Sequence, residues 1–391
     1  MFKKIIIFTL AFALLLPLSL LISSSEGSDS VIPIASTDSL MLDCEAAILM
    51  EATTGNVLYE KNADTPLPPA SVTKIMTLLL VMEAIASGKL TYDTQVTASA
   101  NAASMGGSQI FLKENETMSV DDLLKSVVIA SANDAAVALA EHIAGSESAF
   151  VEKMNARAAE LGMQNTNFEN TNGLDDTAQN HVISARDIAI MSRELISHKD
   201  ILKYSGTWLD SIRNGEFGLT NTNRLVRFYN GCTGLKTGST SKAKFCISAT
   251  AERDGMSLIA VIMASPSRDT RNNAAKQLLD YGFANYELFS PSLQLPESVR
   301  VLGGEKDNCT VGAESFCAVI PKGSSKNVKA ELTLPESVKA PVNKGDAVGR
   351  VEYSLNGTKI GESSVTANES TAKINYFQMF CKIVGFFLLK L

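Results

Sequence analysis

The chain has 391 residues, a hydrophobic content of 45% and a formal net charge of −7. Such a length predicts two or three domains, and this hydrophobic fraction is ample for a large core. Nothing in the charge pattern points to nucleic acid as a partner, because phosphate binding requires basic patches.

The first residues indicate export. Residues 1–4 carry two lysines, residues 5–22 form an apolar run interrupted by Pro17, and residues 23–28 are small and polar. This order is typical of a secretory signal peptide, which we place at residues 1–30 with cleavage between about Ser24 and Ser30. An uncleaved membrane anchor is the alternative interpretation.

Apolar runs predict one antiparallel sheet made from distant parts of the chain. Residues 46–50 and 56–60 are typical of two strands, and residues 245–250 and 258–263 of two more, the second pair joined by a turn at residues 253–255. With helices between residues 71 and 200 packed beside the sheet, and a closing helix at residues 274–286, the fold class is α+β.

The first chemical motif is Ser71-Val72-Thr73-Lys74. On a helix, positions i and i+3 share a face, so the Lys74 amine lies within reach of the Ser71 hydroxyl. A serine needs an adjacent base to act as a nucleophile, and a desolvated lysine is such a base. The structural alternative is that Ser71 is simply the N-cap of a helix, a role compatible with the first.

Two later motifs, Ser131-Ala132-Asn133 and Lys236-Thr237-Gly238, supply a second hydroxyl, an amide and a second cation. Taken singly, Ser131-Ala132-Asn133 fits an ordinary loop or helix cap. Lys236-Thr237-Gly238 taken singly fits an edge strand, in which the lysine protects the edge and the glycine lets another backbone approach. Their order with the first motif, as helix, loop and strand, predicts a serine acyl-transfer enzyme of the penicillin-recognising type. Lys236 would also lower the pKa of Lys74 by its like charge.

Other chemistries find no support in the sequence. The three histidines, His142, His181 and His198, lack the spacing of zinc ligands, and no phosphate-binding loop is present. We therefore expect neither a metal nor a cofactor.

Composition changes near residue 290. Short strand-like runs and turns over residues 291–371 predict a small β-sandwich. Residues 372–391 repeat apolar side chains at helical spacing but are too interrupted for a confident membrane span, which favours a helix lying at a membrane surface. A helix packed on the sandwich is the alternative.

Six cysteines are present, and an exported chain can pair some of them. Cys309 and Cys317, across a possible hairpin, are the predicted pair, while pairing of Cys232 with Cys246 is left open because register is unknown. No cysteine is expected to act as a nucleophile. The full set is Cys44, Cys232, Cys246, Cys309, Cys317 and Cys381.

With these motifs in place, the chain resembles the D-alanyl-D-alanine carboxypeptidases, the low-molecular-mass penicillin-binding proteins. The resemblance is dense from about residue 46 to 287 and includes residues 67–77, 104–109, 130–135 and 172–175, besides the three motifs. It implies a penicillin-binding/β-lactamase-like catalytic domain at residues 31–290, followed by the small all-β domain and the amphipathic anchor.

The resemblance also implies catalytic roles. Ser71 would be the acylated nucleophile, Lys74 the general base, and Ser131 the group that passes a proton to the leaving amine. The oxyanion hole would be formed by the backbone N–H groups of Ser71 and Ser239. Some relatives carry a bulkier residue at the position of Ser239. This departure affects the shape of the strand edge after Lys236-Thr237-Gly238, but not the oxyanion hole, which uses backbone groups.

Substrate binding is assigned in the same way. Asn133 would hold the substrate amide, Thr237 would bind the terminal carboxylate, and Lys236 would set the field and orient Ser131. Arg271 would add charge near that carboxylate, unless it is a solvated surface residue. The complete implied set is Asn133, Lys236, Thr237, Gly238, Ser239 and Arg271.

The function expected is removal of the terminal D-alanine from peptidoglycan stem peptides, with covalent inhibition by β-lactams. The alternatives are a β-lactamase, which would need a carboxylate such as Glu169 or Asp175 near the site, and a non-catalytic β-lactam sensor. The expected location is the outer face of the cytoplasmic membrane, with the protein held peripherally by its C-terminal helix.

Overall fold

The computed structural model describes residues 40–175 and 178–388. A five-stranded antiparallel sheet with strand order β2-β1-β11-β10-β9 organises the first unit. Because β1 pairs with β11, strands from the two ends of this unit meet at the centre of the sheet. The predicted α+β fold is confirmed. The strands are β1 (Ala46–Glu51), β2 (Val57–Lys61), β9 (Cys232–Thr240), β10 (Lys244–Arg253) and β11 (Met256–Ser265).

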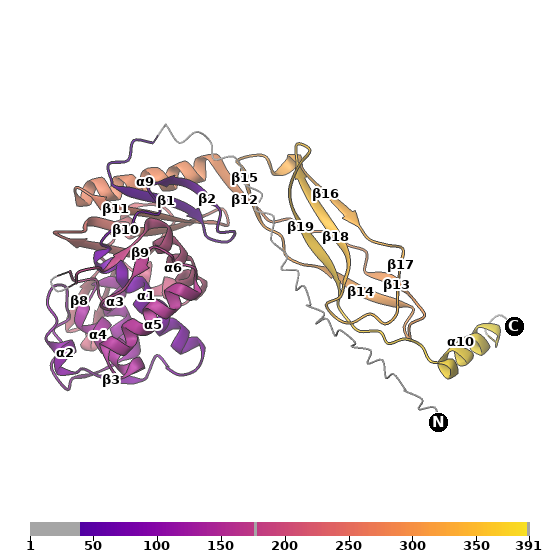
Figure 1. Cartoon of the computed structure of the whole chain (residues 1–391), viewed down its shortest axis with the longest axis horizontal. Helices are drawn as coiled ribbons and strands as arrows, with labels where there is room; N and C mark the ends of the chain where they lie inside the picture. The colour runs from indigo at the N-terminus through magenta and orange to yellow at the C-terminus, as the bar shows by residue number, and fades with distance from the viewer. Residues whose placement is uncertain (1–39, 176–177, 389–391) are drawn as a thin grey trace, which may run out of the picture.

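Helices cover both faces of this sheet (Figure 1). Helix α9 (Arg268–Asn285) packs on one face, and α6 (Ala185–Ser197) packs on the other with most of the remaining helices of this unit behind it. Along β1, Ala47 and Leu49 belong to the α9 core, and Ile48 and Met50 to the larger helical core. A strand buried on both faces has no need to alternate polar and apolar residues, which explains the continuous apolar runs in the sequence.

Serine side chains cap several helices. Ser267, for example, accepts a hydrogen bond from the Thr270 N–H, so α9 starts at Arg268. The predicted start at Ala274 was too late, because the first turns of α9 are polar and lack an apolar period. The other helices are α1 (Lys74–Ala86), α2 (Ala100–Ala103), α3 (Val120–Ile129), α4 (Asn133–Ala144), α5 (Glu147–Glu160), α7 (Ile201–Ser205) and α8 (Leu225–Phe228). Short strand pairs connect them: β3 (Gln95–Thr97) with β4 (Thr117–Ser119), β5 (Thr166–Asn167) with β6 (Val182–Ile183), and β7 (Leu209–Ile212) with β8 (Phe217–Thr220).

The predicted N-cap role of Ser71 is wrong. Residues Ala70–Thr73 form a 3₁₀ turn, and α1 begins only at Lys74. Ala70 has a φ of +49°, a conformation that is strained for a residue with a Cβ atom. The tight turn thus places Ser71 ahead of the helix rather than at its cap.

The second unit contains only strands and one short 3₁₀ turn (Figure 1). A six-stranded sheet has the order β16-β18-β19-β14-β13-β17, and β12 (Tyr286–Phe289) pairs separately with β15 (Ala318–Pro321). Its core includes Tyr353, whose ring stacks on that of Phe316 with centroids 4.0 Å apart. The remaining strands are β13 (Ser298–Leu302), β14 (Asn308–Ala313), β16 (Val328–Thr333), β17 (Ser337–Lys339), β18 (Ala347–Leu355) and β19 (Thr358–Ala367).

Helix α10 (Tyr376–Leu388) ends the described chain and buries none of its residues. The alternative of a core helix packed on the sandwich is therefore wrong, although Gln378 contacts Glu305 and Lys382 contacts Gly304 and Asp307 of the β unit. None of the helices within residues 40–175 and 178–388 is both long and apolar enough to cross a membrane. The predicted signal peptide at residues 1–30 lies outside the described residues.

All six cysteines are free, so the predicted Cys309–Cys317 disulfide is absent. The two residues belong to different strand pairings: Cys309 lies in β14, which pairs with β13 and β19, while Cys317 precedes β15, which pairs with β12. The Cys309 thiol donates instead to the Glu369 carbonyl at 3.3 Å. The hairpin that would have joined them does not form.

Candidate active site

The first two predicted catalytic residues lie side by side. The Lys74 Nζ is 3.0 Å from the Ser71 Oγ, and the lysine side chain is completely buried. The 3₁₀ turn and the first turn of α1 hold the two groups together, so the predicted i, i+3 contact forms although Ser71 is outside the α-helix.

Lys74 is fixed by two further oxygen atoms. Its Nζ lies 2.6 Å from the Asn133 Oδ1 and 2.9 Å from the Asn172 carbonyl oxygen. Burial, followed by the charge of Lys236, holds the pKa of Lys74 well below its usual value. A neutral amine has two N–H donors and one lone pair. With both donors used by the two carbonyl oxygens, the lone pair is left for the Ser71 hydroxyl.

A second hydroxyl–amine pair faces the first. Lys236 on β9 donates to the Ser131 Oγ and to the Thr237 carbonyl, both at 2.9 Å. Ser131 precedes α4 with a φ of +64°, a strained conformation that aims its side chain toward β9. Burial, and then the charge of Arg271, lower the pKa of Lys236 to about 7.

Asn133 connects the site to the loop that contains Gly106 and Gly107. Its Nδ2 donates to the Gly106 carbonyl at 2.7 Å, and its backbone N–H donates to the Ser108 carbonyl at 2.7 Å. The next residue, Asp134, accepts hydrogen bonds from the backbone N–H groups of Ile110 and Leu112. The start of α4 therefore holds residues 106–112 in place beside the site.

Gly238 lets β9 approach the 3₁₀ turn at residues 70–73, which carries the predicted nucleophile Ser71 and is called the nucleophile turn below. A Cβ atom at this position would lie 2.8 Å from both the Pro69 carbonyl oxygen and the Ser71 backbone nitrogen. No residue with a side chain fits there without moving backbone. The close approach brings Ser239 beside the Ser71 N–H, where two backbone donors can face one oxygen atom.

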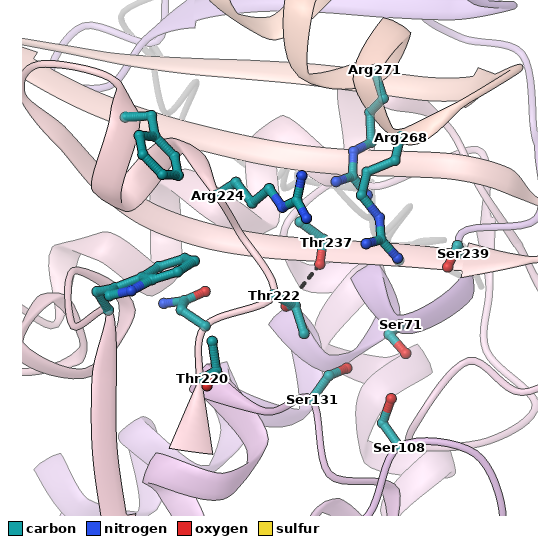
Figure 2. A pocket seen from close by; sticks show the side chains of 14 residues that line it. Ser71, Ser108, Ser131, Thr220, Thr222, Arg224, Thr237, Ser239, Arg268 and Arg271 are labelled. Carbon is teal, nitrogen blue, oxygen red and sulfur yellow. Dashed lines mark hydrogen bonds between the residues drawn. The ribbon is translucent and has the colours of Figure 1, made fainter. Parts of the chain in front are cut away.

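A pocket of about 640 Å³ opens in front of these groups (Figure 2). Ser71, Ser131, Thr237 and Ser239 line it, and the Thr237 hydroxyl donates to Thr222 at 2.9 Å. Its remaining lining residues are Ser108, Trp208, Thr220, Asn221, Thr222, Arg224, Phe228, Gly238, Arg268 and Arg271.

Arg271 is not a solvated surface residue. Its side chain is buried at one edge of the pocket, and its guanidinium donates to the Asn272 Oδ1 and to the Cys246 carbonyl. Burial, and then the charge of Arg268, lower the pKa of Arg271 to about 10, so it remains charged at neutral pH. It lies on the early turns of α9, ahead of the predicted helix start at residue 274.

Two contributors to the site were missed. Asn172 holds Lys74 through a backbone carbonyl, which no side-chain pattern reveals, although residues 172–175 belonged to the family resemblance. His181 accepts a hydrogen bond from the Glu169 N–H at its Nδ1, so its Nε2–H donates to Thr73 beneath the nucleophile turn. Within the described part of the chain, no three His, Cys, Asp or Glu side chains gather in a way that would hold a metal ion.

A serine hydroxyl beside a buried amine, facing a second hydroxyl–amine pair and a cationic pocket, is the arrangement expected of a serine acyl-transfer enzyme. Comparison with known proteins gives the family. Residues 34–267 match the family model described as D-alanyl-D-alanine carboxypeptidase, and residues 283–373 match that of the penicillin-binding protein 5 C-terminal domain. The chain belongs to the D-alanyl-D-alanine carboxypeptidase family and is a serine-type peptide hydrolase.

Named relatives extend along most of the chain. It is 41% identical to the D-alanyl-D-alanine carboxypeptidase DacF of Bacillus subtilis (strain 168), over 89% of this chain and 91% of the relative. It is 37% identical to DacC of Escherichia coli (strain K12), over 86% of each. Among solved structures, penicillin-binding protein 5 from Haemophilus influenzae aligns with a TM-score of 0.75 and 34% identity, over 85% of this chain and 99% of that one.

Proposed function

We propose that the enzyme removes the terminal D-alanine from peptidoglycan stem peptides ending in D-Ala-D-Ala, through an acyl-enzyme on Ser71. The observation that carries the proposal is the set of three contacts at the buried Lys74 amine, of which two are with carbonyl oxygens and the third, at 3.0 Å, is with the Ser71 hydroxyl. β-Lactams acylate the same serine and remain attached, as expected of a penicillin-binding protein.

Acylation begins when Lys74 takes the Ser71 proton and the freed oxygen attacks the carbonyl of the penultimate D-alanine. The developing oxyanion is held by the backbone N–H groups of Ser71 and Ser239. Removal of one such donor typically costs about 10²- to 10³-fold in rate. The contact between Gly238 and the Ser71 turn keeps the two donors in place.

Departure of the terminal residue requires a proton on its amine. Ser131 delivers it, and the 2.9 Å contact with Lys236 orients the Ser131 hydroxyl for this transfer. Water then hydrolyses the acyl-enzyme and regenerates Ser71. No bound cofactor enters any of these steps.

The terminal carboxylate binds between hydroxyl groups and cations. Thr237 donates a hydrogen bond to it, while Lys236 and Arg271 supply positive charge behind Thr237. Asn133, held by Gly106, presents its amide to the acyl part of the peptide. Charge-assisted hydrogen bonds of this kind are stronger than neutral ones, which favours a substrate with a free C-terminus.

The two alternatives make different demands on the site. A β-lactamase needs a group that activates water on the acyl-enzyme, but no Asp or Glu is among the described residues that line the pocket. Glu169 instead accepts hydrogen bonds from the backbone of residues 179 and 180. A sensor would need a signalling module that spans the membrane, and α10 is too short to span one.

Two substrates separate the possibilities. The purified chain without residues 1–30 is incubated with a peptide ending in D-Ala-D-Ala and, separately, with a labelled penicillin. We expect release of D-alanine, a stable label on Ser71, and loss of both in Ser71→Ala. Rapid turnover of the penicillin without D-alanine release would favour the lactamase, and stable labelling without peptide cleavage would favour the sensor.

The proposed location rests on the expected signal peptide and on the C-terminal helix. Exported by its signal peptide, the protein rests on the outer face of the cytoplasmic membrane, with the catalytic domain at residues 31–290 held off the surface by the domain at residues 291–371. Helix α10 supports this role because aromatic side chains such as Phe377, Phe380 and Phe387 are exposed.

Vesicles test the membrane contact. The chain should sediment with liposomes of mixed zwitterionic and anionic lipid, and deletion of residues 372–391 should abolish sedimentation while D-alanine release continues. Sedimentation of the truncated chain at the level of the intact chain would overturn the anchor.

A further inference from the structure

Three arginines gather around Thr237 in the pocket (Figure 2). Arg224 lies just before α8, while Arg268 and Arg271 lie on the first turns of α9, and Arg224 and Arg268 point toward Thr237 from opposite sides in this view. The pocket lining within the described residues includes no Asp or Glu. The pocket therefore carries more positive charge than the single carboxylate at the end of a D-Ala-D-Ala peptide would neutralise.

The partners of these arginines differ. Arg271 donates to Asn272 and to the Cys246 carbonyl. Across residues 40–175 and 178–388, the side chains of Arg224 and Arg268 make neither a hydrogen bond nor an ion pair. Several other arginines of the fold are paired with carboxylates, such as Arg157 with Glu83, Glu160 and Glu194. Unpaired guanidinium groups in a catalytic pocket point to anionic groups on the ligand.

The position of the excess charge relative to the scissile bond follows from the proposed function, on which this inference rests. The terminal carboxylate belongs to the residue that leaves, so Thr237 marks the site of the leaving residue. Figure 2 shows Thr222 and Arg224 on the side of Thr237 that is turned away from Ser71 and Ser239, and both residues line the pocket. The extra charge of Arg224 therefore lies on the leaving-residue side of the pocket.

We propose that Arg224 forms a subsite for an anionic side chain on the leaving D-residue, beside the arginines of α9 that face the terminal carboxylate. The chemistry of the reaction is unchanged. The same amide bond breaks, water supplies the oxygen of the new carboxylate, and the acidic D-amino acid departs with the proton that Ser131 delivers. The enzyme is thus expected to prefer a C-terminal D-glutamate to its neutral isostere, D-glutamine.

The test compares three peptides that are identical except for a final D-Ala, D-Glu or D-Gln. The quantity measured is the ratio of kcat/KM for the D-Glu peptide to that for the D-Gln peptide, which cancels differences in side-chain size. An ion pair near the protein surface predicts a ratio of about fivefold at low salt, decreasing as salt is added. Arg224→Gln should bring the ratio close to one, and Arg224→Lys should retain part of it.

Arg227→Gln is the matched control. Arg227 is on α8, near Arg224, but its guanidinium lies over the rings of Trp208 and Phe228, at 5.7 and 5.5 Å from their centroids. A subsite at Arg224 predicts that this control keeps the D-Glu preference.

Three results would overturn the inference: a ratio of one in the unmodified enzyme, a ratio that survives Arg224→Gln, or an equal loss in Arg227→Gln, which would indicate the general field of the surface. The D-Ala peptide separates this failure from that of the proposed function. Release of D-alanine without a D-Glu preference would refute the subsite alone. If no D-amino acid were released from any of the three peptides, both proposals would be refuted.

Discussion

Replacing Gly238 with alanine tests how closely β9 must approach the nucleophile turn. The new Cβ atom would lie 2.8 Å from the Pro69 carbonyl oxygen, 2.8 Å from the Ser71 nitrogen and 2.9 Å from the Val72 nitrogen. All three are backbone atoms, so no flexible side chain can yield. Ordinary contact begins at about 3.4 Å, and the strand and the turn must therefore separate by roughly half an ångström.

The cost follows from the geometry of the oxyanion hole. Its two proposed donors, the N–H groups of Ser71 and Ser239, belong to the two segments that are pushed apart. Loss of one donor costs about 10²- to 10³-fold, and a displacement of about 1 Å costs up to about 10²-fold. For half that displacement we expect acylation to slow by about 10-fold.

The assay is the second-order rate constant for acylation by a fluorescent penicillin, measured together with the thermal unfolding midpoint. Gly218→Ala is the matched control, because Gly218 also lies in a strand and its Cβ would meet no atom within 4 Å. We expect the control to acylate at the normal rate. If Gly238→Ala acylates as fast as Gly218→Ala, the reasoning about the close approach is refuted.

Three further predictions concern protons and thiols. Lys236→Gln removes the second cause of the low pKa of Lys74, so the acid limb of the acylation rate should move to higher pH; a shift to lower pH would contradict the assignment of the base. Burial lowers the pKa of His181 from 6.5 to about 4. As the pH falls, the imidazole is therefore protonated in the unfolded chain at a higher pH than in the folded chain. Between pH 6.5 and 4 the free energy of unfolding should decrease by about 3 kcal/mol, and urea titrations of His181→Gln should lack this component. Because Cys309 and Cys317 are free, alkylation of the unfolded chain without reductant should label both fully, as mass spectrometry would report.

The strands of the sheet were predictable from sequence because each is a short apolar run next to a recognisable turn. Residues 253–255, expected as a hairpin turn, do connect β10 to β11, with positive φ angles at Asp254 and Gly255 that suit such a turn. The apolar runs on each side left little choice of element. The predicted sheet made from distant parts of the chain is confirmed by the pairing of β1 with β11, although their order in the sheet was not predicted.

The details that escaped prediction depend on contacts between distant segments. Gly173 has a φ of +84°, and a Cβ atom there would lie 1.9 Å from the Ala70 carbonyl oxygen, so the loop before residue 175 is pressed against the nucleophile turn. This packing accompanies the 3₁₀ turn at Ser71 and brings the Asn172 carbonyl to Lys74. A local propensity for an N-cap serine carries no information about a loop one hundred residues away.

Lys74 connects the stability of the fold to its chemistry. The amine is buried with carbonyl oxygens of Asn133 and Asn172 as partners, and these accept hydrogen bonds from a neutral amine without any carboxylate in direct contact. The charge of Asp134 favours the protonated form, but burial and Lys236 oppose it more strongly. Protonation would thus leave a buried cation without an ion-pair partner, a costly state in a folded protein. In the proposed mechanism, the same packing that completes the core therefore keeps Lys74 ready to accept a proton, and the transfer from Ser71, which creates a compensating negative charge at the acyl group, relieves that cost.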